Sequence, residues 1–121
     1  MKNFKSLMIG IFAVFAVALS IIGSTSAFAL DRHVTVYNDK GSSMLTLRGT
    51  NTGDPNWGPD LLGSGTIPPG YHARVNFDDG SRRCFYDLKA TFDDGTTVIR
   101  NNVNVCVAVA WRIDPFANTI G

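Results

Sequence analysis

The stretch CFYDLKATFDDG, residues 84–95, decides the fold class. Apolar and polar residues alternate over 84–92, as in a strand that faces a core on one side. The inward row is Cys84, Tyr86, Leu88, Ala90 and Phe92, and the outward row is Phe85, Asp87, Lys89 and Thr91. Asp94-Gly95 follows, a pair favoured in two-residue hairpin turns because glycine accepts a positive φ. We therefore expect a strand, a tight turn and a second strand over 96–100.

Similar alternation predicts further strands on both sides of this hairpin. They are expected over 33–38, 43–48, 71–77 and 103–113. The first two are expected to form a hairpin. In 71–77 the inward row begins at Tyr71, and in 103–113 the odd-numbered row from Val103 to Trp111 is the more apolar one. The tail after Pro115 is expected to be loosely attached, with Phe116 and Ile120 as residues that can dock.

Composition favours the same fold class. All ten acidic residues are Asp and Glu is absent. Asp favours turns, whereas Glu is a good helix former. Six or seven short strands with turn signals between them predict an all-β fold, either a small antiparallel β-sandwich or an open barrel.

The N-terminus has the features of a signal peptide. Lys2 and Lys5 precede an apolar run over 7–22, and Ala27-Phe28-Ala29 matches an A-x-A cleavage pattern. We expect cleavage after Ala29, which leaves 30–121 as a single domain without a membrane span. This predicts an exported protein, in the periplasm or outside the cell.

The mature chain has two cysteines, Cys84 and Cys106. An even number of cysteines in an exported chain predicts a disulfide. In the chain-entropy model, closing a loop of this length contributes about 3 kcal/mol to stability. The sequence leaves open whether the bond joins two sheets or neighbouring strands.

The charge of the mature chain excludes one class of partner. Without Lys2 and Lys5, nine basic residues remain against ten acidic ones. No basic stripe is present, so we expect no nucleic-acid partner. The sequence does not specify the oligomeric state, and no cofactor is expected.

A loop over 51–70 interrupts the strand pattern. It holds four of the five prolines, so neither a long helix nor a central strand can cross it. Residues 60–62 have the signals of a single helical turn. Trp57, Asp60 and Leu61 in this loop, with Phe85 on an outward row, are the candidate partner-binding residues. The alternative, which we favour, is that Trp57 folds back with the neighbouring leucines as a plug over one end of the core.

The motif FDDG occurs twice, at 77–80 and at 92–95. Its acids, Asp78, Asp79, Asp93 and Asp94, are weak candidates for a calcium site. Calcium prefers a D-x-D-x-D-G type of loop closed by a distal acid, and neither copy has that spacing. We interpret both copies as turns and expect them at opposite ends of the domain.

Candidates for catalysis are few. His33 and His72 are the only histidines, no G-x-S-x-G is present, and His72 falls on an outward face. Asp87 is the one acid inside a strand, and we expect it to form a cross-strand salt bridge. A small hydrolase or metal-dependent enzyme that uses His72 and the Asp-rich turns remains an alternative.

The residues from 34 to 106 resemble a family of small exported bacterial proteins that has no established biochemical function. The shared pattern is W-G-x-D-x-L-G, P-G, C-x-Y-D-L, D-G and N-x-C, which here begins at Trp57 and ends at Cys106. The resemblance implies a secreted β domain with two cysteines, and it assigns no catalytic residues.

These observations favour a non-catalytic binding domain. We expect the chain to present the 51–70 loop to a protein or another component of the cell envelope. A calcium-stabilised structural module is a further alternative.

Overall fold

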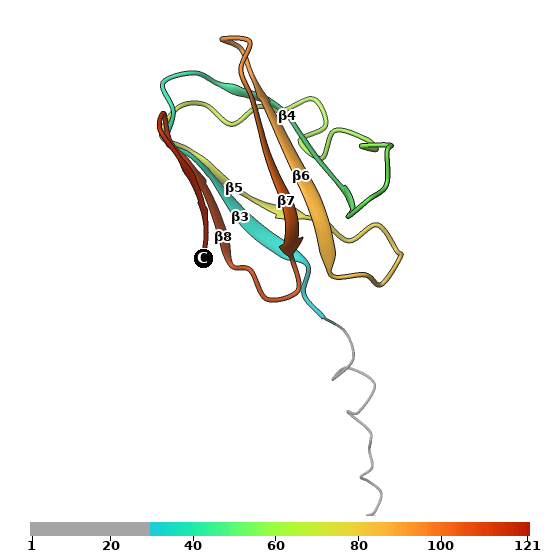
Figure 1. Cartoon of the computed structure of the whole chain (residues 1–121). Helices are drawn as coiled ribbons and strands as arrows, with labels where there is room; N and C mark the ends of the chain where they lie inside the picture. The colour runs from blue at the N-terminus through green and yellow to red at the C-terminus, as the bar shows by residue number, and fades with distance from the viewer. Residues whose placement is uncertain (1–29) are drawn as a thin grey trace, which may run out of the picture. The chain divides into compact units, whose positions relative to one another are not determined.

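The computed structural model describes residues 30–121 (Figure 1), so the expected signal peptide over 1–29 lies outside the described residues. The described part contains strands and turns but no helix. The strands are β3 (His33–Asn38), β4 (Met44–Asn51), β5 (His72–Asn76), β6 (Phe85–Phe92), β7 (Thr97–Asn104), β8 (Ala110–Ile113) and β9 (Asn118–Ile120). Between residues 30 and 121 no helix has the length and apolar character to cross a membrane.

The strands form two sheets, in the orders β5-β3-β8-β9 and β4-β6-β7 (Figure 1). The sheets do not close into a barrel, so the predicted all-β fold is confirmed in its sandwich form. Every strand pair is antiparallel except β3 with β8, which run parallel. A parallel pair needs a long connection, and the chain from β3 to β8 passes through the whole second sheet.

The core lies between the inward rows of the two sheets, as the period-2 pattern predicts. Its largest fully buried side chains include Trp111 and Ile113 from β8, and Tyr86 and Leu88 from β6. Val34 and Val36 from β3 are also fully buried. Alternation in the sequence therefore identifies the inward face of each of these strands.

The expected hairpin between the first two strands is wrong, because β3 and β4 belong to different sheets. Asn38, at the end of β3, is fully buried. Its side-chain amide donates hydrogen bonds to the carbonyls of Ser42 and Ile67, both at 2.8 Å. These bonds hold the chain as it leaves one sheet for the other.

The two FDDG copies form different connections. At 92–95, Phe92 donates its N–H to Thr96 O at 2.9 Å and Gly95 has a φ of 86°, so this copy is the predicted hairpin turn. The copy at 77–80 instead leads from β5 to β6 and therefore crosses between the sheets. Tyr71, expected to face inward, is 65% exposed, because β5 begins one residue later.

The predicted single strand over 103–113 is wrong. β7 ends at Asn104, a turn follows over 105–107, and β8 begins at Ala110. The side chain of Asn104 accepts the N–H of Cys106 at 3.1 Å, which bends the chain at the disulfide. Val107 and Val109 consequently lie outside the core, 72% and 70% exposed.

The C-terminal tail is bound more firmly than the sequence indicates. Residues 118–120 form β9, which pairs with β8. The indole N–H of Trp111 donates to the Asn118 side chain at 3.0 Å. Ile120 packs against the core as expected, whereas Phe116 is 97% exposed.

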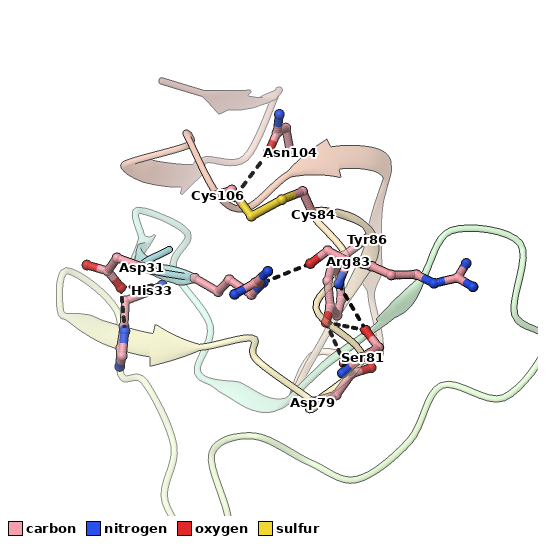
Figure 2. Close-up of a disulfide and its surroundings, with 10 residues drawn as sticks. Asp31, His33, Asp79, Ser81, Arg83, Cys84, Tyr86, Asn104 and Cys106 are labelled. Atoms are coloured by element: carbon pink, nitrogen blue, oxygen red, sulfur yellow. Dashed lines mark hydrogen bonds and ion pairs between the residues drawn. A yellow bond between two sulfur atoms is a disulfide. The ribbon is translucent and has the colours of Figure 1, made fainter. Parts of the chain in front are cut away.

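The disulfide between Cys84 and Cys106 is present, with a Cα–Cα distance of 5.3 Å (Figure 2). Cys84 immediately precedes β6, Cys106 is the second residue after β7, and these strands are neighbours in one sheet. Val105 also donates its N–H to Cys84 O at 2.8 Å. The bond therefore closes the end of the β6–β7 hairpin rather than joining the two sheets.

Candidate functional site

The loop over 51–70 runs along the free edge of β4. Leu47 donates its N–H to Asp60 Oδ1 at 2.9 Å, and Leu61 donates its N–H to Leu47 O at 2.7 Å. Farther along, Met44 and Ile67 exchange two backbone hydrogen bonds of 2.9 and 3.0 Å. An unpaired edge strand is a template for unwanted pairing. The loop covers that edge and is itself held in one conformation.

Asp60 is the residue that fixes the middle of this loop. Its Oδ1 accepts the N–H groups of Leu47 and Leu62, the latter at 3.0 Å. Residues 61–64 form turns instead of the expected helical turn. The Asp60 carboxylate is thus already committed to the backbone, which makes its role in this structure one of support.

Trp57 lies on the outer face of the three-stranded sheet. The Lys89 ammonium is 5.3 Å from the centre of its ring, within the range of a cation–π contact. Arg48, which lies opposite Lys89 in the β4–β6 ladder, donates to Gly58 O at 2.7 Å. Trp57 is half-buried. The predicted plug is therefore formed by Leu61 and Leu62, which pack against the core, and not by Trp57.

Phe85 is on the same outward row of β6 as Lys89 and is 49% exposed. Lys89 is four positions after Phe85, which corresponds to about 13 Å along a strand. The Phe85 carbonyl accepts the N–H of Thr52 at 3.1 Å, so the start of the loop passes beside it.

Asp87 lies between Phe85 and Lys89, and the expected salt bridge is wrong. Its oxygens accept hydrogen bonds from Thr52 Oγ1 at 3.0 Å, Gly53 N at 3.4 Å and Asn102 N at 2.9 Å. Asn102 has a φ of 58°, at the irregular part of the β6–β7 ladder. Asp87 therefore fastens the start of the loop to β6 and supports the bulge in β7.

The two FDDG segments, 77–80 and 92–95, lie at opposite ends of the three-stranded sheet (Figure 1). The Asp79 carboxylate accepts a hydrogen bond from the side chain of Asn51, at the end of β4. The Asp93 carboxylate accepts the backbone N–H of Ser43, just before β4 begins. Asp78 and Asp94 accept backbone N–H groups two residues ahead, as in Asx turns. Within 30–121 no three His, Cys, Asp or Glu side chains are arranged to hold a metal ion.

Asp79 accepts hydrogen bonds from three other residues, Asn51, Ser81 and Tyr86. The Tyr86 hydroxyl donates to its Oδ1 at 2.6 Å, and Ser81 N donates to the same oxygen at 3.0 Å (Figure 2). Burial raises the pKa of Asp79, but the hydrogen bonds from Ser81 and Tyr86 outweigh burial and hold the pKa below its ordinary value. Burial, and the bond to Asp79, raise the pKa of Tyr86.

The two histidines lie on the outer face of the four-stranded sheet. The His72 ring is 5.0 Å from the ring of Tyr37. His33 Nδ1 lies 2.7 Å from Asp31 Oδ1. Arg74 donates a hydrogen bond of 2.7 Å to the other carboxylate oxygen, Asp31 Oδ2. Sequence reasoning missed this Asp31–His33–Arg74 group. The two-residue spacing of Asp31 and His33 is a local signal, but Arg74 joins them only because β3 pairs with β5.

Several residues of the W-G-x-D-x-L-G, C-x-Y-D-L and N-x-C pattern have structural roles. Asp60 anchors the loop, Tyr86 binds Asp79, Asp87 joins the loop to two strands, and Asn104 bends the chain at Cys106. The pattern thus describes how the fold is held together.

Fold and site define a disulfide-bonded domain of two β-sheets with a fixed loop that carries a half-buried tryptophan. Comparison of the chain with known protein families, with curated proteins and with solved structures found no match.

Proposed function

We propose that this chain is a non-catalytic binding domain that is exported and presents the 51–70 loop to a protein or another component of the cell envelope. The signal-peptide features of the N-terminus and the resemblance to exported bacterial proteins support the export. A disulfide is compatible with an oxidising compartment.

The observation that carries the proposal is the way Trp57 is held. Its ring lies over Lys89, while the backbone on its C-terminal side is bound to β4 through Arg48 and Asp60. Holding a binding loop in one conformation reduces the entropy lost when a partner binds. Aromatic residues in such positions often supply much of the binding energy. Trp57, with Lys89 and Arg48 beside it, is the expected centre of contact.

Retention on bacterial cell-envelope fractions tests this proposal. Labelled protein is incubated separately with peptidoglycan sacculi, with lipid vesicles and with solubilised envelope proteins. Loss of a central aromatic contact costs about 2 kcal/mol or more, so Trp57→Ala should weaken binding to the retaining fraction about thirty-fold. Phe116→Ala is the matched control, because Phe116 is an exposed aromatic residue outside the loop.

Thermal unfolding of both variants establishes that the fold is intact. If folded Trp57→Ala protein binds the same fraction as well as the wild type does, the loop is not the contact surface. If the wild type binds none of the three fractions, an envelope partner is excluded.

A further inference from the structure

A hollow of about 230 Å³ lies on the outer face of the four-stranded sheet. Its polar side is formed by Asp31, His33 and Thr35 at and before β3, together with Arg74 from β5. The opposite side is the segment 106–109. One water molecule needs roughly 10–15 Å³ of such volume, so the hollow is large enough for a small ligand.

The polar side has more free hydrogen-bond donors than free acceptors. Asp31 Oδ1 already accepts from His33 N and lies 2.7 Å from His33 Nδ1, and Asp31 Oδ2 accepts from Arg74. Among the residues that the structure describes, Asp31 is the only carboxylate that lines the hollow. A guanidinium has five N–H donors, and Arg74 uses one of them on Asp31. Arg74 therefore retains donors for a ligand that accepts hydrogen bonds.

Asp31 also positions these groups. The pKa of Asp31 is lowered chiefly by the hydrogen bond from the His33 backbone and next by the one from the His33 side chain. The charge of Arg74 lowers this pKa further. Asp31 therefore remains ionised and holds Arg74 and His33 beside each other.

The wall opposite is apolar and firmly held. Val107 and Val109 are 72% and 70% exposed, more than any other valine, leucine or isoleucine in the described part of the chain. The disulfide fixes one end of the segment. At the other end, Val109 donates to Gly121 O at 2.8 Å and accepts from Thr35 N at 2.9 Å. Two valines are thus held in solvent next to a group of polar donors.

We propose that this hollow binds a small carboxylate that carries a short aliphatic group. The carboxylate accepts hydrogen bonds from Arg74, and the aliphatic group covers Val107 and Val109. Charge-assisted hydrogen bonds from the Arg74 guanidinium favour binding of the carboxylate. Burial of apolar surface on the two valines favours binding of the aliphatic group. The site is on the opposite sheet from Trp57 and is independent of the proposed function.

Titration of ¹⁵N-labelled protein with 3-methylbutanoate, followed by ¹H–¹⁵N chemical shifts, tests the proposal. We expect saturable shifts in 31–35, 74 and 106–109, with a Kd in the millimolar range because the ligand is small. The neutral isostere 3-methylbutanamide should bind much more weakly. N-acetylvaline distinguishes the source of the carboxylate, since tighter binding than 3-methylbutanoate would indicate the C-terminus of a peptide.

Two variants separate the parts of the site. Arg74→Gln should weaken 3-methylbutanoate binding roughly ten-fold or more, through loss of a charged hydrogen bond. Val107→Ser should weaken it roughly three-fold through loss of apolar contact. Arg112→Gln is the matched control: Arg112 is on the same sheet face but pairs with Asp39 and covers Tyr37.

Three results would overturn the proposal. They are the absence of saturable shifts, equal binding of 3-methylbutanamide, and equal weakening by Arg74→Gln and Arg112→Gln. The last would show attraction by general charge instead of a site.

Discussion

The carboxylate of Asp60 accepts the backbone N–H of Leu47 at 2.9 Å, at the edge where a further strand would otherwise pair with β4. A single side chain thereby joins an irregular loop to a sheet. This contact explains how a segment rich in proline and glycine keeps one conformation, and it places Trp57 on the outer face of the sheet.

Replacement of Asp60 should destabilise the domain. Asp60→Ala removes the acceptor for the N–H groups of Leu47 and Leu62, and we expect the free energy of unfolding to fall by about 1–3 kcal/mol. Urea denaturation measures this loss. Asp54→Ala is the control, because Asp54 accepts one N–H in an exposed turn and its removal should change stability by less than about 0.5 kcal/mol. Equal effects of the two variants would contradict the role of Asp60.

Gly49 should not tolerate a side chain. A Cβ at this position in β4 would lie 2.6 Å from the ring of Phe77, which is buried in the core. Gly49→Ala should therefore lower the free energy of unfolding by about 1–3 kcal/mol. Gly41→Ala is the matched control, since a Cβ there meets nothing within 4 Å. A Gly49→Ala protein as stable as Gly41→Ala would show that Phe77 does not pack as described.

Asp94 should titrate at an unusually low pH. The hydroxyl of Thr96, then its N–H, holds the pKa of Asp94 at about 2, below the ordinary value of 3.8. Because the folded-state pKa is depressed, the stabilising contribution is present above about pH 4 and is lost as the pH falls toward 2. NMR titration of the Asp94 carboxyl gives the midpoint directly.

A matched pair of threonine variants tests the cause of this shift. Thr96→Val should raise the midpoint for Asp94, whereas Thr97→Val should leave it unchanged. A wild-type midpoint near the ordinary value would refute the turn geometry.

The disulfide should contribute strongly to stability. The double variant Cys84→Ser, Cys106→Ser loses the cross-link over 22 residues, and we expect about 3 kcal/mol less stability. Urea denaturation of oxidised wild type and the double variant measures the difference. Reduced wild type should unfold like the double variant. If the double variant is as stable as the oxidised protein, the bond does not support the fold.

Alternation in the sequence predicts the inward faces of β3, β6 and β8, because a strand between two environments must alternate. It does not predict which strands are neighbours. The sequence favours pairing of 33–38 with 43–48, yet buried Asn38 sends the chain into the other sheet. The bond from Asn38 to Ile67 O spans 29 residues, so the local pattern does not contain it.

The candidate site was predicted in part. The composition of the loop indicates Trp57 as a candidate. The outer face on which Trp57 lies follows from its contact with Lys89, which is 32 positions away along the chain. The sequence places Val107 and Val109 on the more apolar row of a single strand over 103–113. The turn at Cys106 shifts both outward, and the hollow beside Arg74 results from that shift.

Amide hydrogen exchange of Leu61 and Ile67 tests most directly whether the 51–70 loop is held as a fixed part of the sheet. Both N–H groups bond to β4, so they should exchange about as slowly as the backbone amides of β6. Exchange at the rate of an unstructured peptide would contradict the account, because the loop would then have no fixed surface on which to present Trp57.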